Sequence, residues 1–99
     1  MAKLGDIVEK IRAKNAGPFW VTVDIFCGDT GRFDEVVSRL DTGRICTLVK
    51  ADIQTTRRFD IEDLAVIKFS FVRKEVQGSR FDRDMHGAQM AVLFAELDI

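Results

Sequence analysis

The sequence is poor in the residues from which small self-contained sites are built. It has one histidine, one proline and two cysteines, and Cys27 and Cys46 are too far apart to form a CxxC pair. Structural zinc sites need four Cys or His ligands, and disulfide-dependent domains need several cysteine pairs. We therefore expect no metal site and no cofactor, and we expect both thiols to be reduced and partly buried.

Motifs for nucleotide binding and for nucleophilic catalysis are also missing. The chain contains no GxxxxGK[ST], no GxGxxG and no GxSxG. These motifs supply the backbone amides that hold phosphates and the turn that exposes a nucleophilic serine. A self-sufficient hydrolase is therefore disfavoured, and nucleotide binding has no support from a motif.

The chain lacks an excess of charge of one sign, since 15 basic and 16 acidic residues leave a formal net charge of -1. It therefore has no overall field to hold a nucleic acid or an anionic membrane. No apolar run approaches the roughly 20 residues that span a bilayer, and Asp6 and Glu9 interrupt the N-terminus. We expect no nucleic-acid partner, no membrane association and a cytoplasmic location.

What the sequence does contain is typical of a folded domain. Its 99 residues are 46% hydrophobic and 31% charged, without low-complexity runs or a visible linker. This length lies near the commonest size of one domain, and this composition is that of globular proteins. We predict a single domain over residues 1–99.

The clearest predicted strand covers residues 19–27, which are rich in β-branched and aromatic side chains. Period-two alternation places five of them on one face: Phe19, Val21, Val23, Ile25 and Cys27. Residues 28–31 have turn chemistry, and Asp29 or Thr30 can cap a following helix. The apolar side of that helix consists of Phe33, Val36, Val37 and Leu40.

The remaining segments are less distinct. Residues 61–71 predict a second half-buried strand, and the polar residues 74–84 predict an exposed loop. Residues 3–14 and 45–49 each fit either a helix or a strand, and for residues 87–99 alternation favours a turn of helix leading into a final strand over one C-terminal helix. Together these elements predict an α+β fold, with a small mixed or antiparallel sheet and helices on one face, as in ferredoxin-like folds.

One candidate site is the turn that precedes the first clear strand. Lys14, Asn15 and Gly17 join a cation, an amide and a permissive Gly-Pro turn, where backbone amides and a lysine could hold a carboxylate or phosphate. The alternative is a turn that simply needs glycine, with Lys14 solvated and Asn15 capping the turn.

A second candidate lies in the polar C-terminal loop. His86 follows Asp84, and a histidine beside a carboxylate can donate or accept a proton near neutral pH. Three arginines of the same region could bind an anion or a partner's carboxylates: Arg73, Arg80 and Arg83. The alternative is a surface imidazole within a solvated run of charges.

Arg57 and Arg58 form a small basic patch within an acidic stretch. The patch is too short for nucleic-acid recognition. We expect both side chains to be solvated.

Two segments, residues 14–19 with the strand that follows them and residues 84–89, resemble the domain-of-unknown-function 4387 family. The resemblance covers nearly the whole chain, and residues 67–68, Arg73 and Gly78-Ser79 fit the middle of the family pattern. The positions that fit at the two ends are Lys14, Asn15, Gly17, Asp84, Gly87 and Gln89. The chain departs from the pattern at Ala13, His86 and Met90, and the prolines typical of the middle loop are missing.

The resemblance implies a ferredoxin-like small subunit that associates with a larger acyclic-terpene-utilisation-like protein. Such complexes would have hydratase or lyase activity on acyl-CoA or organic-acid substrates. The candidate ligand or partner-site residues are Lys14, Asn15, Gly17, Arg73, Ser79, Asp84, His86 and Gln89.

Three functional hypotheses follow. The chain could complete a site on a larger enzyme subunit, with the two motif segments meeting at one edge. It could instead be an interaction module that stabilises a larger chain or a homo-oligomer through an apolar sheet face, with Trp20 and Phe26 as anchors. It could also bind a small molecule alone, using His86 with Asp84 as an acid/base pair.

Overall fold

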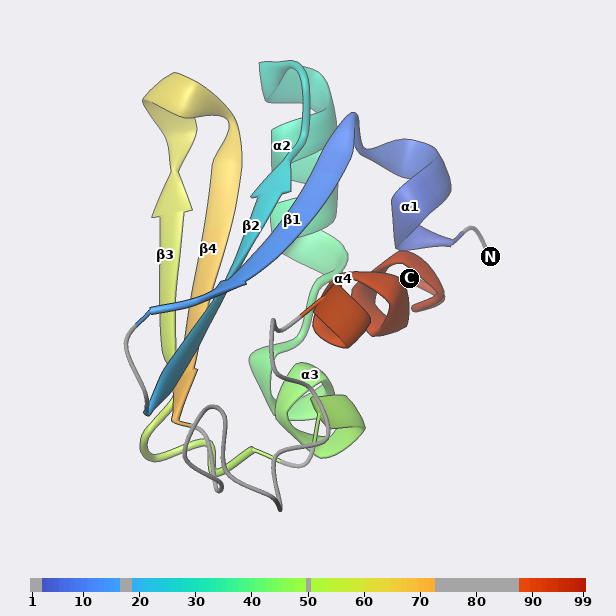
Figure 1. Ribbon diagram of the computed structural model, residues 1–99. Coiled ribbons are helices and arrows are strands. Elements are labelled where there is room, and N and C mark those ends of the chain that lie inside the picture. Colours follow the sequence, from blue (N-terminus) through green and yellow to red (C-terminus); the bar gives the residue numbers. More distant parts are fainter. Residues whose placement is uncertain (1–2, 17–18, 50, 73–87) are drawn as a thin grey trace.

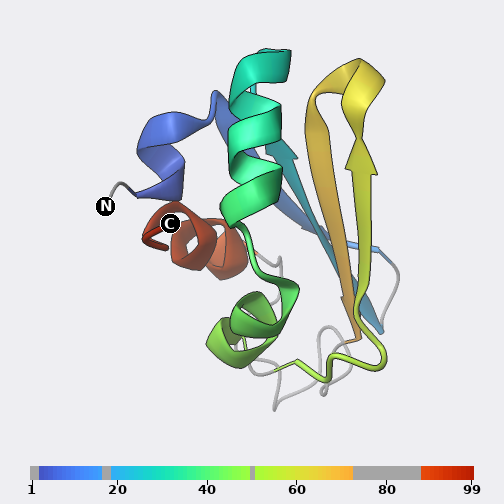
Figure 2. The ribbon, with the colours of Figure 1, turned by 180° about the vertical axis from the view of Figure 1, so that it is seen from behind.

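A four-stranded antiparallel sheet with helices on one of its faces forms the framework of the chain (Figures 1 and 2). The computed structural model describes residues 3–16, 19–49, 51–72 and 88–99. In chain order the elements are α1 (Leu4–Ile7), β1 (Lys10–Asn15), β2 (Trp20–Phe26), α2 (Thr30–Arg39), α3 (Thr42–Val49), β3 (Arg57–Ile61), a 3-10 turn η1 (Glu62–Leu64), β4 (Val66–Val72) and α4 (Ala88–Ala95).

The strand order across the sheet is β1-β2-β4-β3, and every neighbouring pair is antiparallel. Strands β2 and β3 therefore run in the same direction with β4 between them, and α2 and α3 connect them across the helix side. Ferredoxin-like folds run β-α-β-β-α-β along the chain. Here the elements follow the same order except that the strand equivalent to the last strand of that fold, β1, comes before the other strands. The predicted α+β fold, with its sheet and one-sided helices, is confirmed.

The core lies between the sheet and the helices. Val23, Ile25, Ile67 and Phe69 from the two central strands are fully buried there. The Phe69 ring stacks on that of Phe71 at 5.8 Å between centroids, and Phe94 of α4 approaches Phe69 at 5.6 Å. Burying one such aromatic side chain contributes roughly 1.5–3 kcal/mol, so Phe94 helps to hold α4 against the sheet.

Several sequence predictions are confirmed in detail. The strand predicted over residues 19–27 is β2, and the amphipathic helix that follows it is α2. The Asp29 side chain caps α2 by accepting a hydrogen bond from the backbone N–H of Arg32 at 2.7 Å. The ambiguous residues 3–14 contain both candidates, a single helical turn in α1 followed by β1, and residues 45–49 lie in the helix α3.

Other predictions were wrong or incomplete. The strand expected over residues 61–71 begins only at Val66, because Ile61 ends β3 and residues 62–64 form η1. The favoured C-terminal strand is the helix α4, and the only strand-like feature after it in the described residues is a bridge between Lys3 and Asp98. A helix is favoured over a strand here because it buries Phe94 against the sheet, while Leu97 after it still reaches the core. Strand β3 was not predicted, because its exposed residues lack the apolar alternation of a half-buried strand. The loop predicted over 74–84 lies outside the described residues.

Arg58 is not solvated, contrary to expectation, and it links the sheet to two helices. Its guanidinium donates to the backbone oxygen of Leu40 at 2.7 Å and to Thr42 Oγ1 at 3.0 Å. It also pairs with Asp60 at 2.9 Å and lies 5.6 Å from the centre of the Phe69 ring. These contacts satisfy polar groups at the end of α2 and the start of α3, where helices leave carbonyls and amides unpaired.

Replacing this arginine should destabilise the fold. We expect Arg58→Met to lower the free energy of unfolding by about 1–3 kcal/mol, because it leaves the part-buried carbonyls at the end of α2 without a donor. Urea denaturation followed by far-UV circular dichroism measures this change. Arg44→Met, at an exposed position of α3, is the control and should change it by less than about 0.5 kcal/mol. Equal effects of the two substitutions would contradict the role of Arg58.

The two ends of the described chain meet beside β1 (Figure 1). The Leu4 backbone N–H donates to the Leu97 carbonyl at 2.8 Å, and Lys3 forms an ion pair with Glu96 at 2.8 Å. Helices α1 and α4 approach so closely at Gly5 that an added Cβ would lie 2.9 Å from the Cβ of Ala95. Only glycine fits there without a shift of backbone.

Gly5→Ala should therefore separate α1 from α4. We expect it to lower the free energy of unfolding by about 1–3 kcal/mol, the usual result of overpacking. Gly31→Ala is the matched control, since the Cβ there meets nothing closer than 3.4 Å and alanine favours the helix α2. Thermal unfolding of both variants tests the contact, and a Gly5→Ala variant as stable as the parent would exclude it.

Candidate functional site

The face of the sheet that points away from the core is not covered by any described helix (Figures 1 and 2). Strand register aligns its outward side chains in rows that cross all four strands. One row is Lys14, Thr22, Ser70 and Arg57, and the next is Arg12, Asp24, Lys68 and Phe59. A third row is Lys10, Phe26, Val66 and Ile61. We call this surface the open face.

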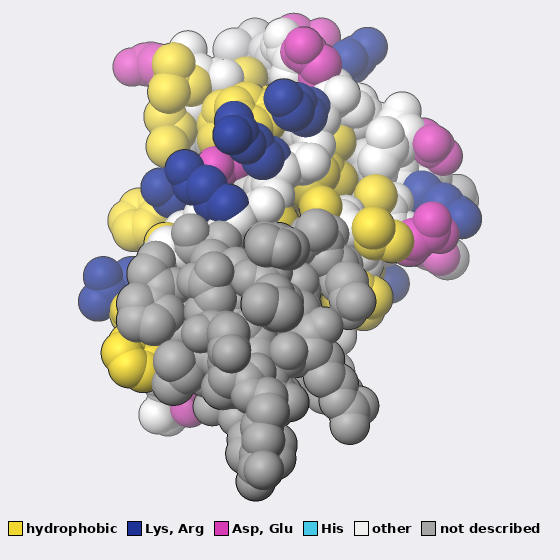
Figure 3. Space-filling view, in the orientation of Figure 1, with side chains coloured by type: hydrophobic (Ala, Val, Ile, Leu, Met, Phe, Trp, Pro, Cys, Tyr) yellow, Lys and Arg dark blue, Asp and Glu magenta, His cyan; other side chains and the backbone are white. Residues whose placement is uncertain are grey.

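The open face has a strong excess of positive charge although the whole chain is nearly neutral. Its three rows contain five basic side chains, namely Lys10, Arg12, Lys14, Arg57 and Lys68, and one acidic side chain, that of Asp24. In Figure 3 the dark blue side chains gather above the grey region, with magenta atoms between them. The excess basic charge on this face is balanced by acidic residues elsewhere, so the net charge of -1 conceals it.

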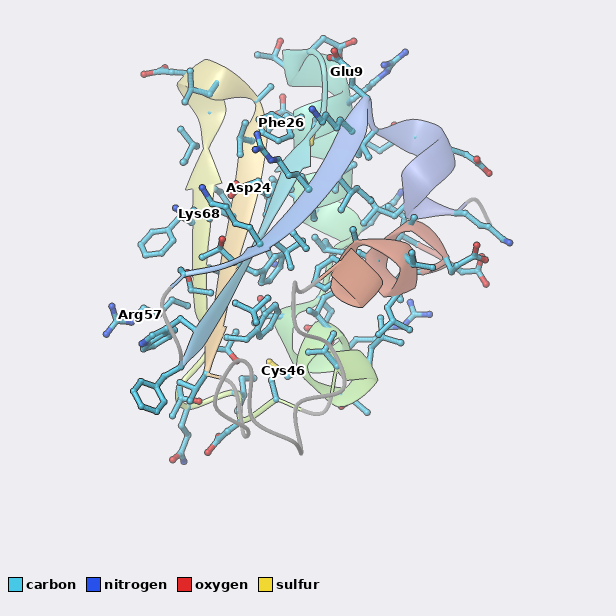
Figure 4. The ribbon with its side chains drawn as sticks, viewed as in Figure 1. Glu9, Asp24, Phe26, Cys46, Arg57 and Lys68 are labelled. Carbon is cyan, nitrogen blue, oxygen red and sulfur yellow. The ribbon has the colours of Figure 1, made fainter. Side chains whose placement is uncertain are left out.

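A shallow hollow of about 290 Å³ lies within this face. Its described lining consists of Ala16, Trp20, Thr22, Arg57, Phe59, Lys68 and Ser70. The Arg57 guanidinium lies 5.4 Å from the centre of the Trp20 ring, within the range of a cation–π contact. Figure 4 shows Lys68 next to Asp24 and above Arg57 on the same side of the sheet. The hollow therefore combines cations, hydroxyls and aromatic surface.

Thr22 is the one polar side chain among the buried residues of the described chain. It is 6% exposed although it lies on the open face. Its hydroxyl reaches the Lys14 backbone oxygen only at 3.5 Å. That distance exceeds the 2.5–3.0 Å of a good O–H···O hydrogen bond.

A second hollow of about 310 Å³ lies between β1, α1 and α4. Its described lining is Gly5, Val8, Glu9, Lys10, Ile11, Ala91, Val92 and Ala95. Only Glu9 and Lys10 supply polar side chains there, so this hollow has few groups that could orient a ligand.

The predicted site residues are only partly placed. Lys14 is exposed on the open face, beside Thr22. Asn15 ends β1 and Gln89 lies in the first turn of α4, but their side chains lie outside what the structure describes. Five other candidates fall outside the described residues: Gly17, Arg73, Ser79, Asp84 and His86. The proposed meeting of the two motif segments is therefore not tested.

Sequence reasoning missed most residues of the hollow. Thr22, Ser70 and Arg57 lie far apart in the sequence and become neighbours only through strand pairing. The alternation within residues 19–27 and 61–71 was a usable signal, because it identifies which side chains face away from the core. The missing information was the pairing of the two strands with each other and with β3.

The two cysteines are free and buried, as predicted. Burial raises the pKa of the Cys27 thiol, and the nearby Asp29 carboxylate raises it further. A nucleophilic cysteine needs the opposite shift, since the thiolate is the reactive form. Cys27 therefore serves as a core residue.

The residues that the structure describes contain no group of three or more potential metal ligands. None of the described helices has the length and apolar character needed to cross a bilayer. The chemistry present on the open face is that of non-covalent binding: guanidinium, ammonium and hydroxyl donors on a rigid sheet can hold an anionic group.

Fold and site together define a small α+β domain with an open, basic sheet face. The family model described as Domain of unknown function (DUF4387) matches residues 4–98. The chain belongs to this family. Searches of curated proteins and of solved structures found no match.

Burial of Cys27 leads to a prediction about thiol reactivity. In a Cys46→Ala variant, the Cys27 thiol should react with Ellman's reagent at least roughly 100-fold more slowly when folded than in denaturant, because reaction requires opening of the core. Absorbance of the released thiolate measures the rate. Rapid labelling of the folded variant would mean that this thiol is accessible.

Proposed function

We propose that this chain is the small accessory subunit of a larger acyclic-terpene-utilisation-like protein. The complex would act as a hydratase or lyase on acyl-CoA or organic-acid substrates. The observation that supports this proposal is the open face, on which basic and aromatic side chains lie together without a described covering element.

The composition of the open face suits an interface. Protein interfaces are enriched in aromatic residues and arginine, and their hot spots are most often Trp, Tyr and Arg. Trp20 and Arg57 pack together there, and Phe59 is 48% exposed beside them. Phe59 would lose this exposed surface on binding, which favours association.

The charge of the open face indicates the chemistry of the partner surface. Five basic side chains against one acidic side chain require a partner surface with an acidic excess. Face-to-face pairing of two copies would bring like charges together, which disfavours a homodimer through this surface. The proposed partner is therefore a different chain, with acidic and apolar residues at its docking surface.

The proposal is tested by co-expression with an acyclic-terpene-utilisation-like protein from the same genome. Size-exclusion chromatography with light scattering should show a stoichiometric complex. The double charge reversal Arg12→Glu and Lys68→Glu should weaken it at least tenfold, because each reversed side chain then opposes an acidic partner surface. Calorimetric titration of the purified subunits measures the dissociation constant.

The matched control carries the same change of charge away from the open face. Arg39→Glu with Arg44→Glu, at exposed positions of α2 and α3, should leave the dissociation constant within about twofold. Absence of any complex would refute the accessory-subunit proposal. Equal weakening by the two double variants would refute docking through the open face.

A further inference from the structure

The hollow in the open face is lined by several hydrogen-bond donors. The row Lys14, Thr22, Ser70 and Arg57 crosses the sheet, so two hydroxyls lie between two cations. Side chains directly opposite each other on antiparallel strands have Cβ atoms about 4.5–5.5 Å apart. Lys68 is the diagonal neighbour of Arg57 and also lines the hollow.

Thr22 indicates that a ligand oxygen belongs in this hollow. Its side chain is more than nine-tenths buried and lines the hollow, and among the described residues its hydroxyl has one long hydrogen bond, to the Lys14 carbonyl at 3.5 Å. A buried hydroxyl without a good partner costs free energy, and an oxygen that accepts from it would remove this cost. No acidic side chain is among the described residues that line the hollow, so an acceptor there meets no nearby carboxylate in the lining.

We propose that this hollow binds a carboxylate group. The carboxylate oxygens accept hydrogen bonds from the Arg57 guanidinium and the Lys68 ammonium. The hydroxyls of Thr22 and Ser70 complete the donor set.

A carboxylate fits this hollow better than a phosphate. Two cations line it beside two aromatic rings, and an inorganic phosphate has no apolar part that could pack on those rings. The rings of Trp20 and Phe59 flank the donors and suit the hydrocarbon part of an organic acid.

This inference rests on the proposed function, because it assigns a ligand to the same face. The carboxylate has two possible sources, a free organic-acid substrate or an Asp or Glu side chain of the partner. Both present the same chemistry to the hollow, and the experiment below separates them.

Trp20 is the single tryptophan of the chain, so its indole N–H gives one NMR signal at the hollow itself. Sodium butyrate should shift this signal saturably in the isolated chain, with a dissociation constant on the order of millimolar. Sodium chloride at equal ionic strength should not reproduce the shift, and inorganic phosphate should bind more weakly. A non-saturable response to butyrate, or tighter binding of phosphate, would overturn the inference.

Single substitutions should change the affinity for butyrate in opposite directions, which a general effect of salt would not do. Arg57→Gln and Lys68→Gln should each weaken butyrate binding about tenfold, and Thr22→Val should weaken it severalfold, through loss of a donor. Asp24→Asn should strengthen binding, because it removes the one negative charge of the three rows. Arg44→Gln is the control and should leave the dissociation constant unchanged. Identical affinities across this series would exclude the hollow as the site.

The complex then identifies the source of the carboxylate. If a partner side chain occupies the hollow, saturating butyrate dissociates the complex; if a substrate does, the complex stays intact while the Trp20 signal shifts. Butyrate binding without any complex would refute only the proposed function. A complex formed by a chain that does not bind butyrate would refute only this inference.

Discussion

The antiparallel pairing of β2 with β4 over seven residues is the constraint on which both faces of the protein depend. In such a pair, side chains alternate strictly between the two sides of the sheet. Ile25 and Phe69 therefore join the helices in the core, while Thr22 and Lys68 face outward. A slip of one residue would exchange the two sets and drive the Lys68 ammonium into an apolar core. The register that builds the core thus also builds the open face.

At the edge of the sheet, the contacts of Arg58 determine which side chains of β3 face the helices and which face outward. Its guanidinium turns inward, where it pairs with Asp60 and reaches carbonyls of α2, so its sequence neighbours must turn outward. Arg57 and Phe59 are thereby held at the rim of the hollow. Arg58, which has a structural role, thus positions Arg57 and Phe59 of the candidate site. This explains how an exposed edge strand can present a defined surface. The helix side and the open face are consequently coupled through β3.

The sequence predicted those helices and strands whose type follows from the pattern of their own residues. Residues 19–27 alternate clearly enough to identify β2 and its buried face, and Asp29 and Thr30 were the two candidates for the cap of α2, of which Asp29 is the cap. The alternation at the C-terminus gave the wrong prediction. Phe94 in a helix and Leu97 just after it reach the same core that the two side chains could also reach from a strand.

The candidate site was predicted least well. Arg57 and Arg58 were treated as one solvated patch, although adjacent residues of a strand point to opposite sides. Lys14 was selected as part of a turn, whereas its place in the structure is a row of side chains drawn from four strands.

Net charge is a poor guide to what such a surface can bind. The value of -1 describes the field far from the molecule, where basic and acidic groups cancel. At physiological ionic strength, however, charges are screened beyond about 8 Å, so a ligand in contact with the open face responds to the local five-to-one ratio. A long polyanion would extend past this face toward the acidic remainder of the surface, whereas a single carboxylate or a compact acidic patch would not. The local charge of the open face therefore favours a small or sharply localised anionic ligand over a long polyanion.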